Sequence, residues 1–112
     1  MSSPHFIFMP LRATTHWLAL SPEQRFAFIG KVLVPILEAH PTVRLRFFDS
    51  EFYSARVSDM AMWETSDLAE WRSLVEGLRE TPFWDHYFAV EDVILSVENA
   101  YAAHYRQAPI SG

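Results

Sequence analysis

Cysteine is absent from the 112-residue sequence, which excludes disulfides, thiolate nucleophiles and cysteine metal sites. Glycine occurs only three times, so no glycine-rich loop is available to cradle nucleotide phosphates. No two histidines stand four residues apart with a glutamate between them, and no serine nucleophile elbow is present, so we expect neither a metal site nor a serine hydrolase. Lysine occurs once, against eight arginines, and the formal net charge of -5 argues against a nucleic-acid partner.

Long apolar runs are also lacking. No segment approaches the roughly 20 residues that span a bilayer, and residues 1–4 do not begin a secretory signal. We therefore expect a cytoplasmic protein with no membrane contact. Half of the residues are hydrophobic and 15% are aromatic, as in globular chains, and we expect a single domain over residues 1–112.

The order of apolar patterns predicts strand, helix, strand, strand, helix, strand and a short terminal helix. The strands are expected at residues 5–11, 42–49, 57–64 and 88–95, with a long connection over 12–20. The first helix begins with the capping box of Ser21 and Gln24, and Pro35 predicts a kink near Lys31. The second follows Asp67, with Glu70 as capping partner and Leu68, Trp71, Val75 and Leu78 buried. Pro10 is expected at a bulge or at the end of its strand.

This order is that of a ferredoxin-like βαββαβ sandwich, an α+β fold with a four-stranded antiparallel sheet and two helices on one face. Right-handed crossovers place the strands at 5–11 and 57–64 in the centre. Both faces of these strands are apolar, although two helices cover only one face. We therefore expect a second copy of the chain to cover the other face, as a homodimer.

Several segments resemble the darcynin family. The similar stretches are residues 16–25, 46–51, 56–65, 78–80, 87–88 and 93–94, and together they cover most of the chain. The resemblance implies a relative of the dimeric α+β barrels, in which two ferredoxin-like sheets pack face to face. That wider group includes cofactor-free monooxygenases, muconolactone isomerases, polyketide cyclases and haem-binding enzymes. No catalytic residue is carried over, because none is established for the family.

Asp59 is a carboxylate within an apolar central strand, and burial of an unpaired carboxylate is costly. We interpret it as a general base or ligand anchor that lines the barrel; the alternative is a structural ion pair buried at the dimer interface. Arg44 and Arg46 share a strand face, and either could meet Asp59 across the hairpin and clamp an acidic ligand. The alternative is that both are exposed arginines that protect an edge strand.

Two histidines in loops, His16 and His86, are the candidate acid–base residues, because histidine titrates near neutrality. The alternative is that each is a bystander. A flat apolar ligand pocket is predicted from four aromatic residues, for which packing in the core or interface is the alternative: Tyr53, Trp63, Trp84 and Tyr87.

The leading hypothesis is a homodimeric barrel that binds a small aromatic or apolar acidic metabolite, as an isomerase, a cyclase or a cofactor-free monooxygenase. No cofactor is expected. A non-catalytic homodimeric interaction module, with residues 83–88 as a contact site, is the second hypothesis. Haem bound through a histidine is the third.

Overall fold

The computed structural model describes residues 4–112, so most of the stretch in which no secretory signal was expected lies outside the described residues. Its sheet has the predicted ferredoxin-like order β2-β3-β1-β4, with β5 paired to β1 beside β4. All of these pairs are antiparallel. The central strands are β1 (His5–Ala13) and β3 (Asp59–Thr65), flanked by β2 (Val43–Asp49), β4 (Phe88–Val90) and β5 (Ile94–Ser96).

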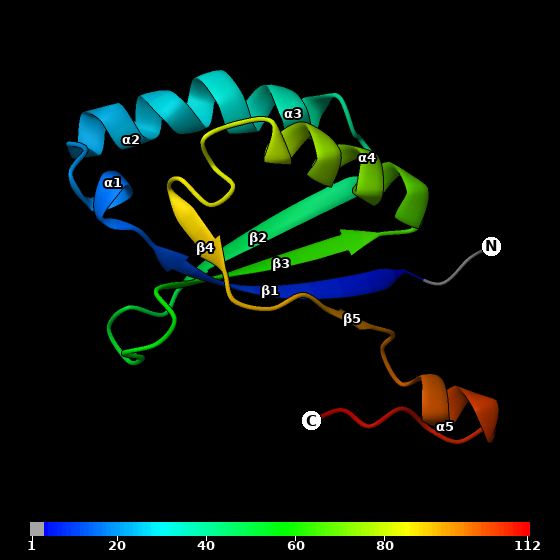
Figure 1. Ribbon diagram of the computed structural model, residues 1–112. Coiled ribbons are helices and arrows are strands. Elements are labelled where there is room, and N and C mark those ends of the chain that lie inside the picture. Colours follow the sequence, from blue (N-terminus) through cyan, green and yellow to red (C-terminus); the bar gives the residue numbers. More distant parts are fainter. Residues whose placement is uncertain (1–3) are drawn as a thin grey trace.

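The helices cover one face of this sheet (Figure 1). A continuous rod of α2 (Pro22–Phe28), η1 (Ile29–Leu33) and α3 (Val34–Glu38) lies beside α4 (Leu68–Arg79). The connection before α2 contains a short helix, α1 (Thr15–Leu18), which was not predicted. The terminal helix α5 (Ala100–His104) lies on the other side of the sheet. No helix of residues 4–112 is long and apolar enough to cross a membrane.

The predicted N-terminal caps are present at α2 and at α4. The Ser21 hydroxyl accepts from the Gln24 backbone N–H, and the Gln24 side chain accepts from the Ser21 N–H, which completes the capping box. Asp67 accepts from the backbone N–H groups of Ala69 and Glu70. The prediction that the Glu70 side chain completes a second box is wrong, because its carboxylate accepts from the backbone and hydroxyl of Thr42.

The long helix contains a π-helical turn just before Pro35. Proline has no N–H to donate to the carbonyl four residues earlier, which would be that of Lys31. In the preceding turn the Val34 N–H reaches back five residues to the Ile29 carbonyl. Where a kink was predicted near Lys31, the structure has a π-helix over Ile29–Leu33.

Pro10 lies inside β1 opposite Met60, so its predicted place at a bulge or strand end is wrong. Its carbonyl accepts from the Glu91 N–H at 2.9 Å, and the backbone N of a strand residue faces the same edge as its carbonyl. At that edge the strand predicted over residues 88–95 is divided into β4 and β5. The missing proline N–H therefore falls at the gap between two strands, where it interrupts no ladder.

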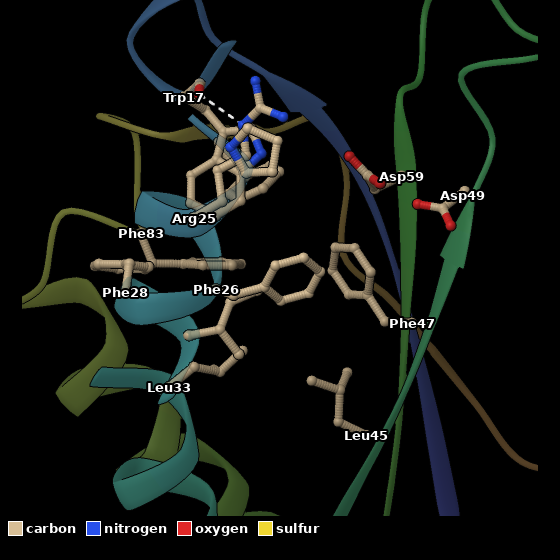
Figure 2. A pocket seen from close by; sticks show the side chains of 13 residues that line it. Trp17, Arg25, Phe26, Phe28, Leu33, Leu45, Phe47, Asp49, Asp59 and Phe83 are labelled. Carbon is tan, nitrogen blue, oxygen red and sulfur yellow. Dashed lines mark hydrogen bonds between the residues drawn. The ribbon is translucent and has the colours of Figure 1, made fainter. Parts of the chain in front are cut away.

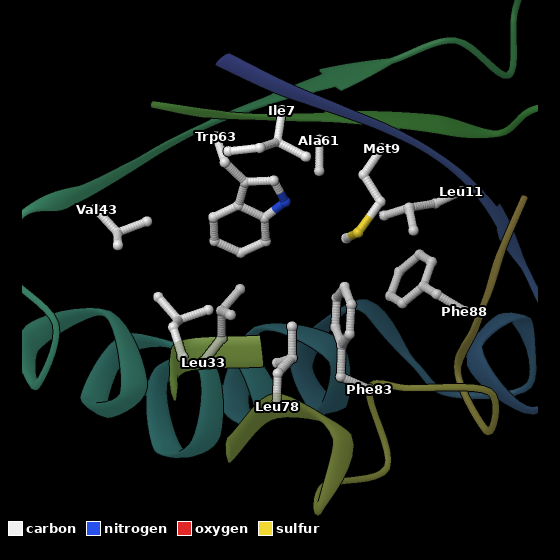
Figure 3. Close-up of a cluster of buried hydrophobic side chains, with 11 residues drawn as sticks. Ile7, Met9, Leu11, Leu33, Val43, Ala61, Trp63, Leu78, Phe83 and Phe88 are labelled. Atoms are coloured by element: carbon white, nitrogen blue, oxygen red, sulfur yellow. The ribbon is translucent and has the colours of Figure 1, made fainter. Parts of the chain in front are cut away.

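The core lies between the sheet and the helices (Figure 3). Residues alternate along β3, so Ala61 and Trp63 are buried beneath the helices while Met60 and Met62 face the opposite side. Leu74 of α4 is fully buried together with Leu78, whereas the predicted core residues Leu68, Trp71 and Val75 are half-buried. The face without helices carries the exposed rings of Phe8 and Phe48.

Candidate functional site

A cavity of about 400 Å³ lies between the α2–η1 rod and strands β2 and β3. Its walls are mostly aromatic and aliphatic, and the rings of Phe26 and Phe47 face each other across it (Figure 2). Among the described residues that line it, the charged ones are Arg25, Asp49 and Asp59. The remaining lining residues are Trp17, Pro22, Phe28, Ile29, Leu33, Leu45, Phe83 and Phe88.

Asp49 and Asp59 form the acidic end of this cavity. They are direct partners in the β2–β3 ladder, so both side chains point to the helix-covered face. Asp59 is 7% exposed, whereas Asp49 is exposed. Two neighbouring carboxyl groups therefore lie at this end of the cavity, and that of Asp59 is buried.

The pKa of Asp59 is raised from 3.8 to about 6. Burial is the largest cause, because removal of water penalises the charged form. The hydrogen bond from Ser58 acts in the opposite direction and lowers the pKa. A hydrogen bond with Asp49 and the negative charges of Asp49 and Glu51 raise it further.

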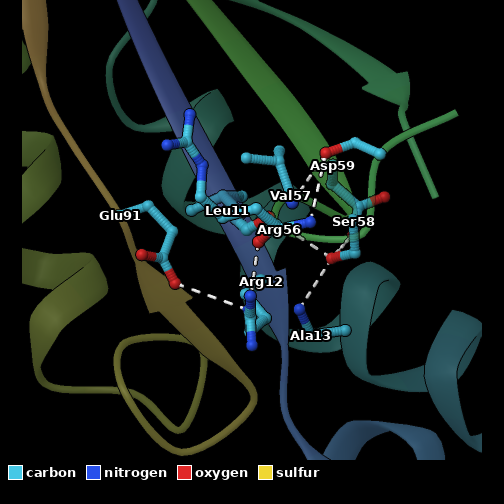
Figure 4. Close-up of polar contacts among 9 residues, drawn as sticks. Leu11, Arg12, Ala13, Arg56, Val57, Ser58, Asp59 and Glu91 are labelled. Carbon is cyan, nitrogen blue, oxygen red and sulfur yellow. Dashed lines mark hydrogen bonds and ion pairs between the residues drawn. The ribbon is translucent and has the colours of Figure 1, made fainter.

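Ser58 fixes the orientation of the Asp59 carboxyl group (Figure 4). Its hydroxyl donates to Asp59 Oδ2 at 2.8 Å and accepts from the backbone N–H of Ala13 at 2.7 Å. The Ser58 backbone N–H is bound to the Leu11 carbonyl at 2.9 Å. The carboxyl group is thereby tied to both central strands and cannot turn freely into solvent.

Arg25 lies on the opposite wall, at the same end of the cavity as Asp59 (Figure 2). Its Nε donates to the Trp17 carbonyl at 3.2 Å and its Nη2 to the Leu18 carbonyl at 3.0 Å, so it caps α1 from α2. These bonds use two of the five N–H groups of a guanidinium. The others are available to an acceptor on a bound molecule.

This arrangement suits proton transfer to or from an apolar molecule. A carboxyl group with a pKa of about 6 is present in both protonation states near neutral pH, as a general acid or base requires. Asp59 is only 7% exposed, so little water reaches its carboxyl group, and the Arg25 guanidinium can stabilise negative charge on the molecule.

The prediction that Arg44 or Arg46 meets Asp59 is wrong. In the ladder Arg44 is opposite Glu64 and Arg46 is opposite Met62. These positions point to the helix-free face, where the Arg46 guanidinium lies 5.2 Å from the centre of the Phe48 ring. Asp59 likewise points beneath the helices, so the expectation that it lines the helix-free face, where a barrel would form, is also wrong.

The four aromatic residues predicted to form one pocket are dispersed. Trp63 is 1% exposed in the core, whereas Tyr53 is 93% exposed on the β2–β3 loop. Trp84 is half-buried and carries the Arg79 guanidinium 5.7 Å from its ring centre. Tyr87 stands behind the cavity wall, with its ring 5.3 Å from that of Trp17.

The two candidate acid–base histidines lie together. The rings of His16 and His86 are stacked with centres 4.3 Å apart, and both side chains are exposed. Thr14 supports the stack, because its hydroxyl donates to the His86 carbonyl. Among the described residues that line the cavity none is a histidine, so the haem hypothesis has no histidine ligand there. In residues 4–112 no group of three or more potential ligands is placed to hold a metal ion.

Sequence reasoning missed Arg25 and Asp49 as site residues. Asp49 follows Leu45 and Phe47 on the same face of β2, so strand alternation could have identified it. Arg25 could not be identified, because its place beside the cavity depends on α1, which was not predicted.

Comparison with protein families matches residues 1–112 to the model of darcynin, described as a domain of unknown function. A darcynin homolog of Granulibacter bethesdensis is 44% identical over 94% of this chain and 86% of its own length. Another, from Streptomyces avermitilis, is 43% identical over 96% of this chain and 90% of its own length.

Solved structures with the same fold include chlorite dismutases of Candidatus Nitrospira defluvii. A variant of that enzyme has a TM-score of 0.71 and 25% identity over 85% of this chain. The enzyme in complex with imidazole has a TM-score of 0.72 and 23% identity over 85% of this chain. This chain spans only 40% of the length of either one.

Proposed function

This chain belongs to the darcynin family, and we propose that it binds a small aromatic or apolar metabolite in the cavity beneath α2, with Asp59 as the group that exchanges a proton with it. The observation that carries the proposal is a carboxyl group with a pKa of about 6 at the end of an apolar cavity of about 400 Å³. Pockets of this size and character commonly hold small molecules.

The chemistry that fits these residues best is isomerisation without a cofactor. As a carboxylate, Asp59 removes a proton from an acidic C–H or O–H group of the ligand. Arg25 stabilises the resulting anion, and Asp59 returns the proton to a different ligand atom. A cyclase or a cofactor-free monooxygenase would use the same first step.

Two features expected of a non-catalytic interaction module do not occur in the described part of the chain. Asp59 has no ion pair with an arginine there, and a cavity of about 400 Å³ remains open beside the core. A carboxyl group without an ion pair beside open apolar space favours a ligand over a purely structural role for Asp59.

The pH dependence of binding tests the site with two probes. Above pH 6 the Asp59 carboxylate should accept a hydrogen bond from 2-naphthol and repel 2-naphthoate, whereas below pH 6 the protonated acid should favour 2-naphthoate. Calorimetric titrations at pH 5 and pH 7 should therefore give opposite trends for the two probes. Asp59→Asn should remove both trends.

A filled-cavity variant supplies the structural control. Leu45→Trp should weaken both probes at least tenfold, because the larger ring occupies the cavity. Leu18→Trp, at a site that is 58% exposed and outside the lining, should bind as the parent protein does. Equal binding to a folded Leu45→Trp variant would refute the cavity as the binding site.

The proposal also includes a homodimer formed through the helix-free face. Phe8 of the central strand β1 and Phe48 of the edge strand β2 are 36% and 42% exposed there, as rings that a partner would cover. Light scattering should give twice the chain mass of 13.0 kDa. A chain mass of 13.0 kDa at micromolar concentration would refute the dimer and leave the cavity proposal intact.

A further inference from the structure

The C-terminal arm, defined as residues 97–112, projects from the molecule on the side without helices (Figure 1). Its helix α5 buries only Ala102. Three large side chains of the arm are open to solvent, with exposed fractions of 78% for Tyr101, 57% for Tyr105 and 85% for Ile110. The arm therefore presents an apolar surface that its own domain does not cover.

This arm nevertheless has a defined shape. Asn99 accepts from the Ile110 backbone N–H at 2.8 Å and donates to its carbonyl at 3.3 Å, which closes the arm on itself. The Tyr101 and Tyr105 rings lie 5.0 Å apart on α5. The arm is thus an ordered projection, and an ordered apolar surface can bind a partner at a low entropic cost.

The molecule as a whole is extended by this projection. Its radius of gyration is 15.8 Å and its longest extent is 51 Å. A compact chain of this length has a radius of gyration of about 13 Å. An arm that packs against another molecule would account for this extra length.

The β2–β3 loop projects at the opposite end of the sheet, and to the same side as the arm (Figure 1). It carries Phe52 and Tyr53, which are 75% and 93% exposed. Between loop and arm lies the helix-free face, which bears charges of both signs at Arg44, Arg46 and Glu64. A surface with both signs of charge can pair with a copy of itself.

We infer that in the homodimer the C-terminal arm of each copy packs against the β2–β3 loop of the other copy. This inference rests on the proposed dimer. In a face-to-face pair, a two-fold axis that lies across the long direction of the sheet brings the arm end of one copy to the loop end of its partner. Two identical contacts then cover Tyr101 and Ile110 with Phe52 and Tyr53 at both ends of the interface. Within one chain these groups are at opposite ends of the sheet and cannot meet.

Cysteine crosslinking tests this arrangement cleanly, because the chain has no cysteine of its own. Tyr53→Cys and Tyr101→Cys are prepared as separate full-length proteins, mixed to allow exchange, and treated with bismaleimidoethane. The mixture should give a covalent dimer on a denaturing gel, whereas each variant alone should give little. Leu18→Cys, exposed on the helix side, should give no covalent dimer with Tyr101→Cys.

Light scattering on the same samples distinguishes a failure of the arm–loop contact from a failure of the dimer itself. A dimer that fails to crosslink in the mixture, or one in which either variant crosslinks with itself, refutes the arm–loop contact and leaves the dimer standing. A monomer refutes both. As a second measure, Tyr101→Ser combined with Tyr105→Ser should raise the dimer dissociation constant at least tenfold without altering the pKa of Asp59.

Discussion

Asp49 and Asp59 lie opposite each other in the β2–β3 ladder, with both carboxyl groups on the face covered by α2. Like charges at directly opposed positions of a sheet repel each other. Asp49 is open to water, whereas Asp59 is buried. Burial is the largest cause of the raised pKa of Asp59, about 6, and the opposed Asp49 raises it further.

Replacement of Asp59 by asparagine should stabilise the protein at pH 8. Because the pKa is 3.8 in the unfolded chain and about 6 in the folded one, the folded state binds the proton more tightly, and stability is lost as pH rises between these values. At pH 8 this loss amounts to at most about 3 kcal/mol. Urea titrations should show Asp59→Asn to be more stable than the parent at pH 8, with a difference that shrinks towards pH 4.

The asparagine variant keeps the shape of the side chain and an oxygen that can accept from Ser58, so packing changes little. If Asp59→Asn were less stable than the parent at pH 8, the carboxylate would be a required structural charge. The opposite result would mark a group that is retained at a cost in stability, as functional residues often are.

Asp49→Asn should lower the pKa of Asp59 below about 6, because it removes a neighbouring negative charge and the hydrogen bond with Asp49. Carboxyl carbon NMR titration measures this pKa directly. Arg44→Gln is the matched control: it removes a charge from the same strand but on the opposite face, so it should change the pKa little. A larger shift in the control than in Asp49→Asn would contradict the strand register.

Most of the fold could be predicted from local signals. The capping box at Ser21, the cap at Asp67 and the shared strand face of Arg44 and Arg46 each reflect spacing within a few residues, and each was confirmed. The division of the last strand was missed, because a single strand was predicted across Glu91 and Asp92, the charged pair that interrupts the apolar residues there. The gap also lies opposite Pro10, which is far away in the sequence.

The site was harder to predict, because it depends on which residues face each other across the sheet. Asp59 was identified from its chemistry alone. Its partner was not, because the turn of residues 50–58 could in principle pair Asp59 with several residues of β2. The observed register selects Asp49, and strand alternation then places both arginines on the other face. The acid–base roles of His16 and His86 stay predictions.

Trp63 should act as a core residue and not as a ligand contact. It is 1% exposed, and its indole Nε1 has no hydrogen-bond partner among the described residues. Trp63→Ala should lower the free energy of unfolding by about 3–5 kcal/mol. Trp63→Phe should cost much less, because it also removes a buried donor that is unsatisfied. Chemical denaturation measures both, and a variant that folds normally but loses 2-naphthol binding would contradict the core role.

Ser58→Ala should raise the pKa of Asp59 above about 6, in the opposite direction to Asp49→Asn. The Ser58 hydroxyl donates to the carboxylate, and a hydrogen bond to the charged form favours ionisation. Its loss should therefore leave more of the acid protonated at pH 7, as the same NMR titration would show. Binding of 2-naphthol at pH 7 should weaken as the accepting carboxylate is lost, and binding of 2-naphthoate should strengthen.

The same substitution also leaves the Ala13 backbone N–H without its acceptor, so some loss of stability is expected in addition. Ser58→Thr is the control, because it keeps the hydroxyl and should keep the pKa of Asp59 near 6. If Ser58→Ala weakened both naphthalene probes equally, the effect would come from distortion of the cavity and not from the protonation of Asp59. Opposite changes for the two probes would identify the Ser58 hydroxyl as the group that keeps Asp59 ready to act as a base near neutral pH.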